Sequence, residues 1–179
     1  MNDINKIIEK AKACGFDEAA YLNVSTIKLM DQVRDMCKEN KCNKYNTNWS
    51  CPPGCSTLEE GRKKLENYSK GVIIQTIGEV EDSFDFETMM EIEEKHKENF
   101  NNFYAVIKEE YANSMAFSSG CCTICTHCTY PDKPCRFPQK CISSMEAYGM
   151  LVSDICKSNK IKYYYGPSKI AYTSCLLIK

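Results

Sequence analysis

The chain contains 179 residues, of which 43% are apolar and 26% are charged, the balance of an ordinary soluble globular protein. Its formal net charge is −1, with basic and acidic residues interspersed, so it lacks the positive field that attracts nucleic acid or an acidic membrane. The longest apolar runs, such as 72–74 and 176–178, are far shorter than the roughly 20 residues that cross a bilayer. The N-terminal segment also lacks the apolar stretch of a secretory signal. We therefore expect a cytoplasmic protein that binds neither nucleic acid nor membranes.

The first part of the chain predicts a helix, a strand and an irregular loop, in that order. Residues 4–13 place their apolar side chains on one stripe, which is typical of an amphipathic helix, and residues 19–27 have the pattern of a strand. Residues 36–55 lose this periodicity and are rich in Cys, Asn, Lys and turn residues, which indicates an irregular loop. Ser56 and Glu59 then match a capping box, so a second helix is expected to begin there.

The middle of the chain predicts a buried strand at 71–78 and a helical region at 86–111. A polar segment inside the helical region leaves one long helix or two short ones as alternatives. A short strand at 115–118 leads into a second irregular loop at 120–141. His96 lies in the charged part of the helical region, and we expect its side chain to be exposed to solvent.

The last part of the chain predicts a helix followed by an antiparallel hairpin. Ser143 and Glu146 form another capping-box pattern with a coherent apolar face behind it. Residues 162–178 have the pattern of a hairpin that turns at 166–168.

Together these patterns predict an α/β (α+β) fold. We expect residues 1–179 to form a single metal-binding domain with a mixed sheet flanked by helices. Two cysteine-rich ligand loops, at about 36–56 and 120–142, would emerge from this sheet.

Cysteine is the unusual feature of the composition, because the chain has thirteen of them. In a reducing compartment thiols stay reduced, so these residues do not predict a disulfide framework, and their odd number agrees. Metal ligation, thiol chemistry and ordinary burial remain, and the spacing has to distinguish them. Cys14, Cys156 and Cys175 lie in predicted helices and strands, and we expect them to be core residues.

The sharpest signal is C-T-I-C-T-H-C-T-Y-P-D-K-P-C, which contains Cys122, Cys125, Cys128 and Cys135. Its first three thiols, at intervals of three residues, can surround one centre, as at the start of the bacterial ferredoxin run. A mononuclear zinc site usually separates two close pairs by a longer arm, so the third closely spaced cysteine favours a cubane iron–sulfur cluster. Cys135 departs from the ferredoxin pattern, because six residues precede it instead of three. It either closes this cluster or reaches another.

A second group, Cys37, Cys42, Cys51 and Cys55, lies in the first loop. Four cysteines within nineteen residues fit one four-thiolate site, but their spacing does not choose between zinc and an iron–sulfur cluster. The eight cysteines of the two groups are therefore the candidate ligands of a metal or cofactor.

Several segments resemble a family of predicted metal-binding proteins, the domain of unknown function 2284. They are V-R-D-M-C-K-E-N-K-C-N-K-Y, W-S-C-P-P-G-C, S-G-C-C-T-I-C-T-H-C-T-Y, K-P-C-R-F-P and S-M-E-A-Y-G, and the likeness covers nearly the whole chain. The resemblance implies a cysteine-rich protein, of a kind common in anaerobes, that binds metal or iron–sulfur clusters and has no settled reaction. The family's cysteines fall on Cys37, Cys42, Cys51 and Cys55, and on Cys122, Cys125, Cys128 and Cys135.

Two further cysteines depart from the family's pattern. Cys121 stands where the family often has a proline, and Cys141 looks like an addition. They are spare ligands, resolving thiols or neighbours without a role, and we prefer the last interpretation.

The leading hypothesis for function is a protein with two [4Fe–4S] clusters that transfers electrons to or from an unknown redox partner protein. One alternative is a redox enzyme in which a cluster keeps an iron open to substrate. The other is a binding module stabilised by zinc. The sequence contains no motif that identifies a general acid or base, so whether the protein is an enzyme stays open.

Overall fold

A computed structural model describes residues 2–179, which form a four-stranded sheet with helices on both faces. The strands are β1 (Glu18–Asn23), β2 (Lys70–Glu79), β3 (Met115–Phe117) and β4 (Lys169–Ile178). The α-helices are α1 (Asn2–Ala13), α2 (Asp31–Lys38), α3 (Leu58–Leu65), α4 (Phe86–Glu110) and α5 (Val152–Ser158), and two short 3₁₀ turns are η1 (Val24–Thr26) and η2 (Glu146–Tyr148). In this part of the chain no helix has both the length and the apolar character that crossing a membrane requires.

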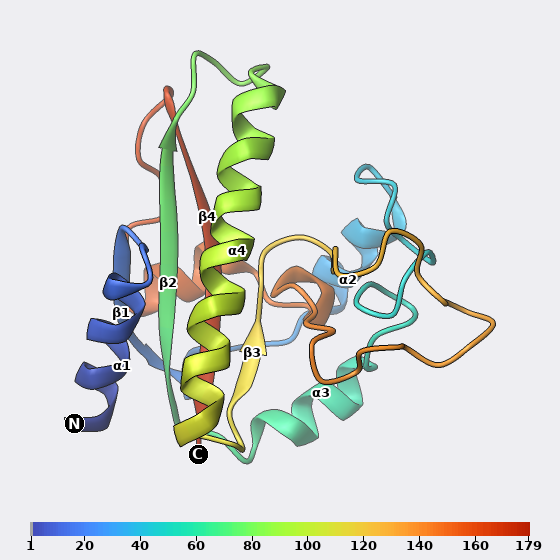
Figure 1. Cartoon of the computed structure of the whole chain (residues 1–179), viewed down its shortest axis with the longest axis horizontal. Helices are drawn as coiled ribbons and strands as arrows, with labels where there is room; N and C mark the ends of the chain where they lie inside the picture. Colours follow the sequence, from blue (N-terminus) through green and yellow to red (C-terminus); the bar gives the residue numbers. More distant parts are fainter. Residues whose placement is uncertain (1) are drawn as a thin grey trace.

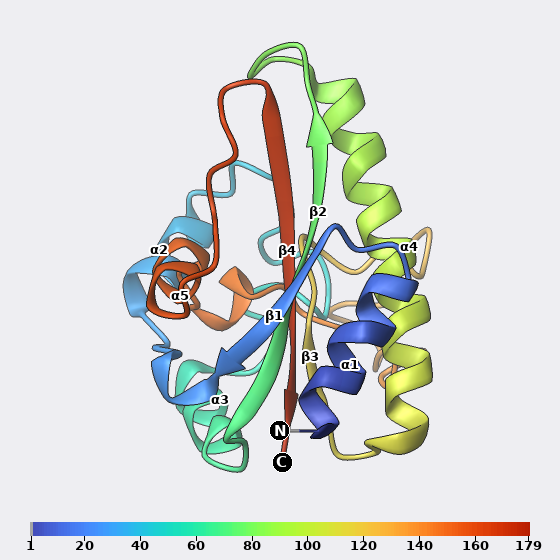
Figure 2. The same ribbon diagram turned by 90° about the vertical axis from the view of Figure 1, so that its left-hand side faces the viewer.

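The helices divide between the two faces of the sheet. Helices α1 and α4 lie on one side, and α2, α3 and α5 lie on the other (Figure 2). Successive residues of the central strand β2 serve these two sides in turn: Val72 and Ile74 pack in the core with α1 and α4, and Ile73 packs in the other core. Because side chains alternate between the faces of a strand, a sheet covered on both faces needs an uninterrupted apolar run. The sequence V-I-I in β2 and C-L-L-I in β4 meets this requirement.

The predicted α/β (α+β) class is confirmed, but the sheet is antiparallel throughout and not mixed. The strand order is β1-β2-β4-β3, and each neighbouring pair is antiparallel. Helix α4 connects β2 to β3, and these two strands run in the same direction, as the alternation of helix and strand suggested. Strand β4 inserts between them, so no two parallel strands are neighbours (Figure 1).

The predicted hairpin at 162–178 is wrong. Only its second half is a strand, and β4 pairs with β2 over ten residue pairs, from Lys70↔Ile178 to Glu79↔Lys169. The segment before β4 is irregular and is held by the buried side chain of Gln75, which donates to Lys162 O at 3.0 Å and accepts from Tyr165 Oη at 2.8 Å. The partner of β4 is therefore β2, which is distant in sequence, and not the segment that directly precedes β4.

The helix starts shift relative to the prediction. The capping box of α3 is formed by Thr57 and Glu60, one residue later than expected. The pattern at Ser143 and Glu146 does not start an α-helix: the chain forms the single turn η2, and helix α5 begins only at Val152. Residues 86–110 form one long helix and not two short ones.

His96 is fully buried, which contradicts the expectation of a solvent-exposed side chain. It continues the apolar stripe of α4 at Phe100, Phe103 and Ile107, a spacing that places all four on the face toward the sheet. Its Nδ1 lies 2.8 Å from the hydroxyl of Thr76 in β2, and its Nε2 lies 2.7 Å from that of Ser174 in β4. His96 has charged neighbours in the sequence, but these neighbours occupy other faces of the helix.

Burial lowers the pKa of His96 to about 3 from an ordinary value of 6.5. The unfolded chain therefore takes up a proton at His96 below pH 6.5 that the folded chain does not bind until near pH 3, so acid destabilises the fold in this window. From about pH 7.5 to about 5.5, we expect the free energy of unfolding to fall by about 1.4 kcal/mol more in the native chain than in His96→Gln. Urea unfolding of both proteins at the two pH values measures this difference. Equal pH dependence in the two proteins would contradict the assignment.

Candidate metal centre

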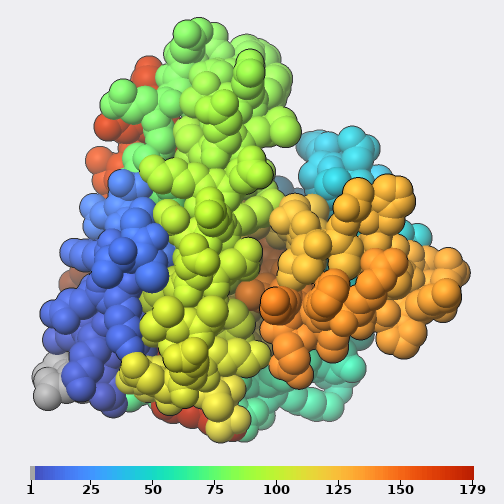
Figure 3. All heavy atoms as spheres, viewed as in Figure 1, coloured from blue at the N-terminus to red at the C-terminus, as the bar shows by residue number. Residues whose placement is uncertain are grey.

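The two cysteine-rich loops lie side by side on one side of the sheet. The first connects α2 to α3, and the second connects β3 to η2 (Figure 1). Figure 3 shows them together as a lobe beside α4. Both are largely irregular, so their shape depends on side-chain hydrogen bonds and on contacts between the loops.

Two aromatic side chains join the loops. The indole of Trp49 in the first loop donates to Lys133 O of the second at 3.1 Å, and its ring packs edge-on against Tyr130 at 4.9 Å between centroids. The Tyr130 hydroxyl donates to Asn46 Oδ1 of the first loop at 2.7 Å. These contacts fix the two loops as one unit.

A buried serine makes the second connection. Ser50 Oγ donates to Asn48 Oδ1 at 2.7 Å and accepts from the backbone N–H of Cys122 at 2.9 Å. Ser50 is fully buried, so this hydroxyl satisfies a backbone group that water cannot reach. The start of the second ligand motif is thereby attached directly to the first loop, beside Cys51.

Asparagine shapes the first loop. Asn40, Asn43 and Asn46 all have positive φ, between 53° and 57°. The N–H groups of Asn40 and Asn43 each close a turn, and that of Asn46 donates across the loop to Pro52 O at 2.8 Å. Asparagine tolerates this left-handed conformation better than other side chains that carry a Cβ. The asparagines of K-E-N-K-C-N-K-Y-N thus allow the repeated reversals that bring its cysteines together.

The second loop brings all four of its predicted ligands to one place and adds a fifth thiol. One enclosed cavity is lined by Cys122, Cys125, Cys128, Cys135 and Cys141. The neighbouring thiols of Cys122 and Cys141 interact, which lowers the pKa of Cys122 and raises that of Cys141. Cys141, for which the sequence predicted no role, thus lies with the four predicted ligands of this loop.

A second group of neighbouring thiols consists of Cys37, at the end of α2, and Cys42, Cys51 and Cys55 of the first loop. Burial raises the pKa of Cys37, and the nearby thiols of Cys42 and Cys55 add to this effect. Burial also raises the pKa of Cys51 to about 11, and the neighbouring thiols of Cys121 and Cys42 act in the same direction. Cys121 therefore lies near Cys51 of the first group, although it is adjacent in sequence to Cys122 of the second.

Arg34 of helix α2 ties the first loop to the turn η2. Its Nη1 donates to Ser56 O at 2.9 Å and to Ala147 O at 2.7 Å, and lies 3.5 Å from Cys55 Sγ. Burial raises the pKa of Cys55, while the guanidinium opposes this shift by favouring the thiolate. The sequence offered no sign of this role, because Arg34 lies outside both loops.

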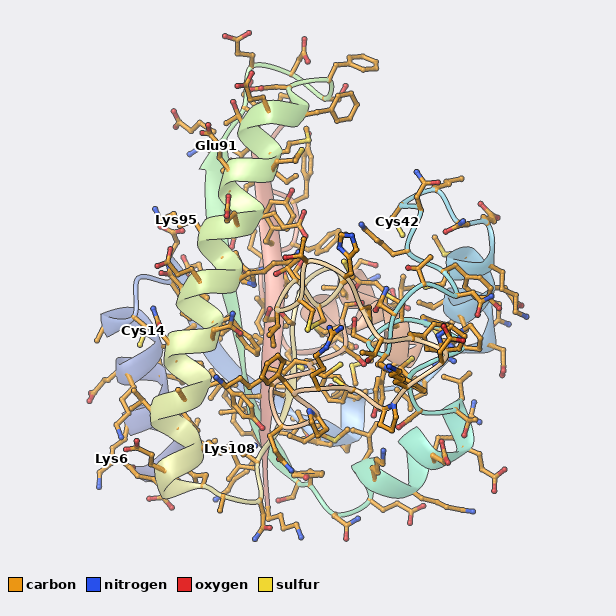
Figure 4. All side chains as sticks on the ribbon, turned by 45° about the vertical axis from the view of Figure 1, so that its right-hand side comes forward. Lys6, Cys14, Cys42, Glu91, Lys95 and Lys108 are labelled. Carbon is orange, nitrogen blue, oxygen red and sulfur yellow. The ribbon has the colours of Figure 1, made fainter. Side chains whose placement is uncertain are left out.

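All thirteen cysteines are free thiols in this structure. Cys156 and Cys175 are fully buried and Cys14 is half-buried against the core, as predicted. Figure 4 places Cys14 on the far side of α4 from Cys42, which marks the outer edge of the lobe. Core and ligand cysteines are thus separated in space.

The donor set of the second loop fits a thiophilic metal group. The lining of its cavity contains five cysteines and no carboxylate or imidazole. Thiolates select zinc, copper(I) and iron–sulfur clusters over hard cations such as magnesium. The thiols do not have the spacing of a coordination site in this structure. Among residues 2–179 no three His, Cys, Asp or Glu side chains lie close enough together to hold a metal ion. Binding would therefore require the thiols to turn inward.

Comparison with known proteins agrees with this chemistry. Residues 20–178 match the model of DUF2284, a family described as predicted metal-binding protein. The chain belongs to this family. The resemblance of the cysteine motifs to DUF2284 is thereby confirmed. No curated protein matches the chain.

One solved structure resembles this DUF2284 chain in part. It is the epoxyqueuosine reductase from Streptococcus thermophilus, with 11% sequence identity and a TM-score of 0.44. The similarity covers 99% of this chain and 46% of that one, so the DUF2284 chain spans less than half of the reductase chain.

A glycine at the junction of the loops offers a test of their contact. A Cβ on Gly54 would lie 2.6 Å from Asn48 O and 2.7 Å from the Tyr130 ring. We expect Gly54→Ala to lower the free energy of unfolding by about 1–3 kcal/mol, because backbone and ring must move apart. Urea unfolding followed by the fluorescence of Trp49 measures this. In a Tyr130→Ala background the added effect should be smaller, and an equal effect in both backgrounds would show that the ring does not touch Gly54.

Arg34 offers a second test. Arg34→Met removes the donor from two backbone carbonyls and should lower the free energy of unfolding by about 1–3 kcal/mol. Arg34→Lys should recover part of the loss, because an ammonium group can reach one of the carbonyls but lacks the planar fork. Chemical denaturation of the three proteins gives the comparison. Arg34→Met as stable as the native chain would mean that these hydrogen bonds contribute nothing.

Proposed function

We propose that this chain binds two [4Fe–4S] clusters through its two loops and transfers electrons to or from a redox partner protein in the cytoplasm. The observation that carries the proposal is the enclosed cavity lined by five cysteines and free of carboxylate and imidazole. The first group, Cys37, Cys42, Cys51 and Cys55, supplies the ligands of the other cluster. When bound, such clusters accept and release single electrons.

The spacing of the thiols favours iron–sulfur clusters over zinc. Ten of the thirteen cysteines lie in or directly beside the two loops, which is enough for two sites of four thiolates each, whether zinc or cluster. Three of them, Cys122, Cys125 and Cys128, keep the spacing of the bacterial ferredoxin run.

The placement of the loops suits electron transfer. Contacts through Trp49, Ser50 and Tyr130 hold the two groups of thiols next to each other, so that an electron could pass from one to the other. One cysteine of each group, Cys42 and Cys128, is exposed, which brings each site to the molecular surface. A partner could therefore exchange electrons without a change in the fold.

A cleft beside the thiols supports a second candidate, a cluster-dependent redox enzyme. Its volume is about 580 Å³, and Cys55, Cys135 and Cys141 all line it, together with Trp49 and Tyr148. Clefts of this size commonly hold small molecules. In this reading an iron left without a fourth thiolate faces the cleft. A spectral shift of the loaded protein on addition of cyanide would support the enzyme, whereas clusters fully ligated by thiolates would show no shift.

The cluster content tests the proposal directly. Protein expressed and purified without oxygen should be brown and contain about eight irons and about eight acid-labile sulfides per chain. After reduction with dithionite, low-temperature EPR should show two interacting paramagnetic clusters. Cys51→Ala should lose about half of the iron, while Cys14→Ala, on the other side of the molecule, should keep all of it.

A colourless protein with zinc and no sulfide would overturn the proposal. It would favour a zinc-stabilised binding module, which a strong chelator should unfold. Circular dichroism before and after addition of the chelator distinguishes the two cases.

A further inference from the structure

The second loop has one thiol too many for a single cluster. Five cysteines line its cavity, and a cubane uses four thiolates. Cys122, Cys125 and Cys128 share the ferredoxin spacing, so the fourth ligand is either Cys135 or Cys141. Sequence spacing and the family resemblance both favour Cys135. The structure allows the two to be compared by position.

Cys141 is anchored to the rigid part of the molecule. Its N–H closes a turn onto Phe137 O at 3.0 Å, and the next residue, Ile142, packs against the core under α1 and α4. Just beyond it, Ser118 at the end of β3 donates to Ser143 O at 3.0 Å and accepts from Met145 N at 3.2 Å. These bonds join the two stems of the loop next to the sheet.

The thiol of Cys141 lies near two other thiols, because Cys122, Cys135 and Cys141 line the same cavity. Cys122 is itself held in place, because Ser50 Oγ accepts its N–H at 2.9 Å. Cys122 and Cys141 are thus each attached to a fixed part of the molecule, as preorganised ligands need to be.

Cys135 lies on a part of the loop that the sheet does not hold. The preceding turn is closed by Lys133 N to Thr129 O at 3.0 Å and Thr129 Oγ1 to Pro134 O at 2.9 Å. The next residue, Arg136, donates to His127 O at 2.8 Å, again within the loop. The contacts of this turn outside its own loop run to the first loop, as in the hydrogen bond from Trp49 to Lys133 O. Cys135 and Cys141 both border the open cleft that Cys55 lines.

We propose that Cys141 is the fourth thiolate ligand of the site formed by Cys122, Cys125 and Cys128, and that Cys135 remains a spare thiol at the wall of the cleft. This inference rests on the proposed function. On ligation the sulfurs of Cys122 and Cys141 bind iron as thiolates and release their protons to solvent. No change in oxidation state is required of either residue.

Three alanine variants test the assignment. Cys141→Ala, Cys135→Ala and the distant control Cys14→Ala are purified without oxygen beside the native chain, and iron and sulfide are measured in each. We expect Cys141→Ala to hold about half of the native iron, with the EPR signal of one cluster lost, and the other two to match the native chain. Full iron in Cys141→Ala, or loss of iron in Cys135→Ala with Cys141→Ala unaffected, overturns the proposal.

Chemical labelling gives an answer that does not depend on the folding of a variant. Cys135 and Cys141 are both half-buried, so burial alone does not protect either from iodoacetamide. In the loaded native protein we expect mass spectrometry to find Cys135 alkylated and Cys141 protected, and both alkylated after the iron is removed. The reverse protection overturns the proposal. A native chain without iron and sulfide instead overturns the proposed function, so the two failures are distinguishable.

Discussion

The site depends on one contact, the hydrogen bond from the backbone of Cys122 to the buried hydroxyl of Ser50. Apart from Cys37 in the last turn of α2, the ligands lie in segments without regular secondary structure, so each loop must satisfy its backbone groups by turns, by side chains or by the other loop. Ser50 does both. Its hydroxyl donates a hydrogen bond to Asn48 of its own loop, and its oxygen accepts the backbone N–H of Cys122 in the second loop. Around it, the Trp49 and Tyr130 rings close the junction from outside. The Ser50 contact is the one that attaches the backbone of a predicted ligand in the second loop directly to the first loop.

The sheet and the elements packed on it fix the positions at which the two loops begin and end. Strand β3 ends at Phe117, and the pairing of Ser118 with Ser143 and Met145 joins the departing and returning ends of the second loop. Arg34 has a similar role for the first loop. From helix α2, before the loop, it donates to Ser56 O at the end of the loop and to Ala147 O in the turn η2. Rigid scaffolds with functional loops are a common division of labour in proteins. Here both loops leave the same region of the scaffold, which is why ten thiols gather in one lobe (Figures 1 and 3).

Helix α4 also contributes to the surroundings of the thiols. Its Glu93 and Lys97 form an ion pair of 2.6 Å against Gly120, where a Cβ would lie 2.3 Å from the Glu93 carboxylate. Gly120 has a φ of +65° and so combines a close approach with a turn that other residues rarely adopt. The ammonium of Lys97 helps to lower the pKa of Cys122, after the larger effect of the hydrogen bond with Cys141. The helix that covers one face of the sheet thereby places a positive charge near the thiols.

The sequence by itself determined the chemistry of the donors: two irregular loops, their cysteine spacing, the absence of a disulfide framework, the α+β class and the family. Local periodicity was enough for β2, α4 and the core cysteines, because each pattern reflects burial within one element. Only the tertiary structure decided that β4 inserts between β2 and β3, that His96 faces two hydroxyls of the sheet, and that Cys141 lines one cavity with the four predicted ligands of the second loop. These results depend on which distant segments meet, and spacing along a chain reports nearness only between residues of the same turn, strand or loop.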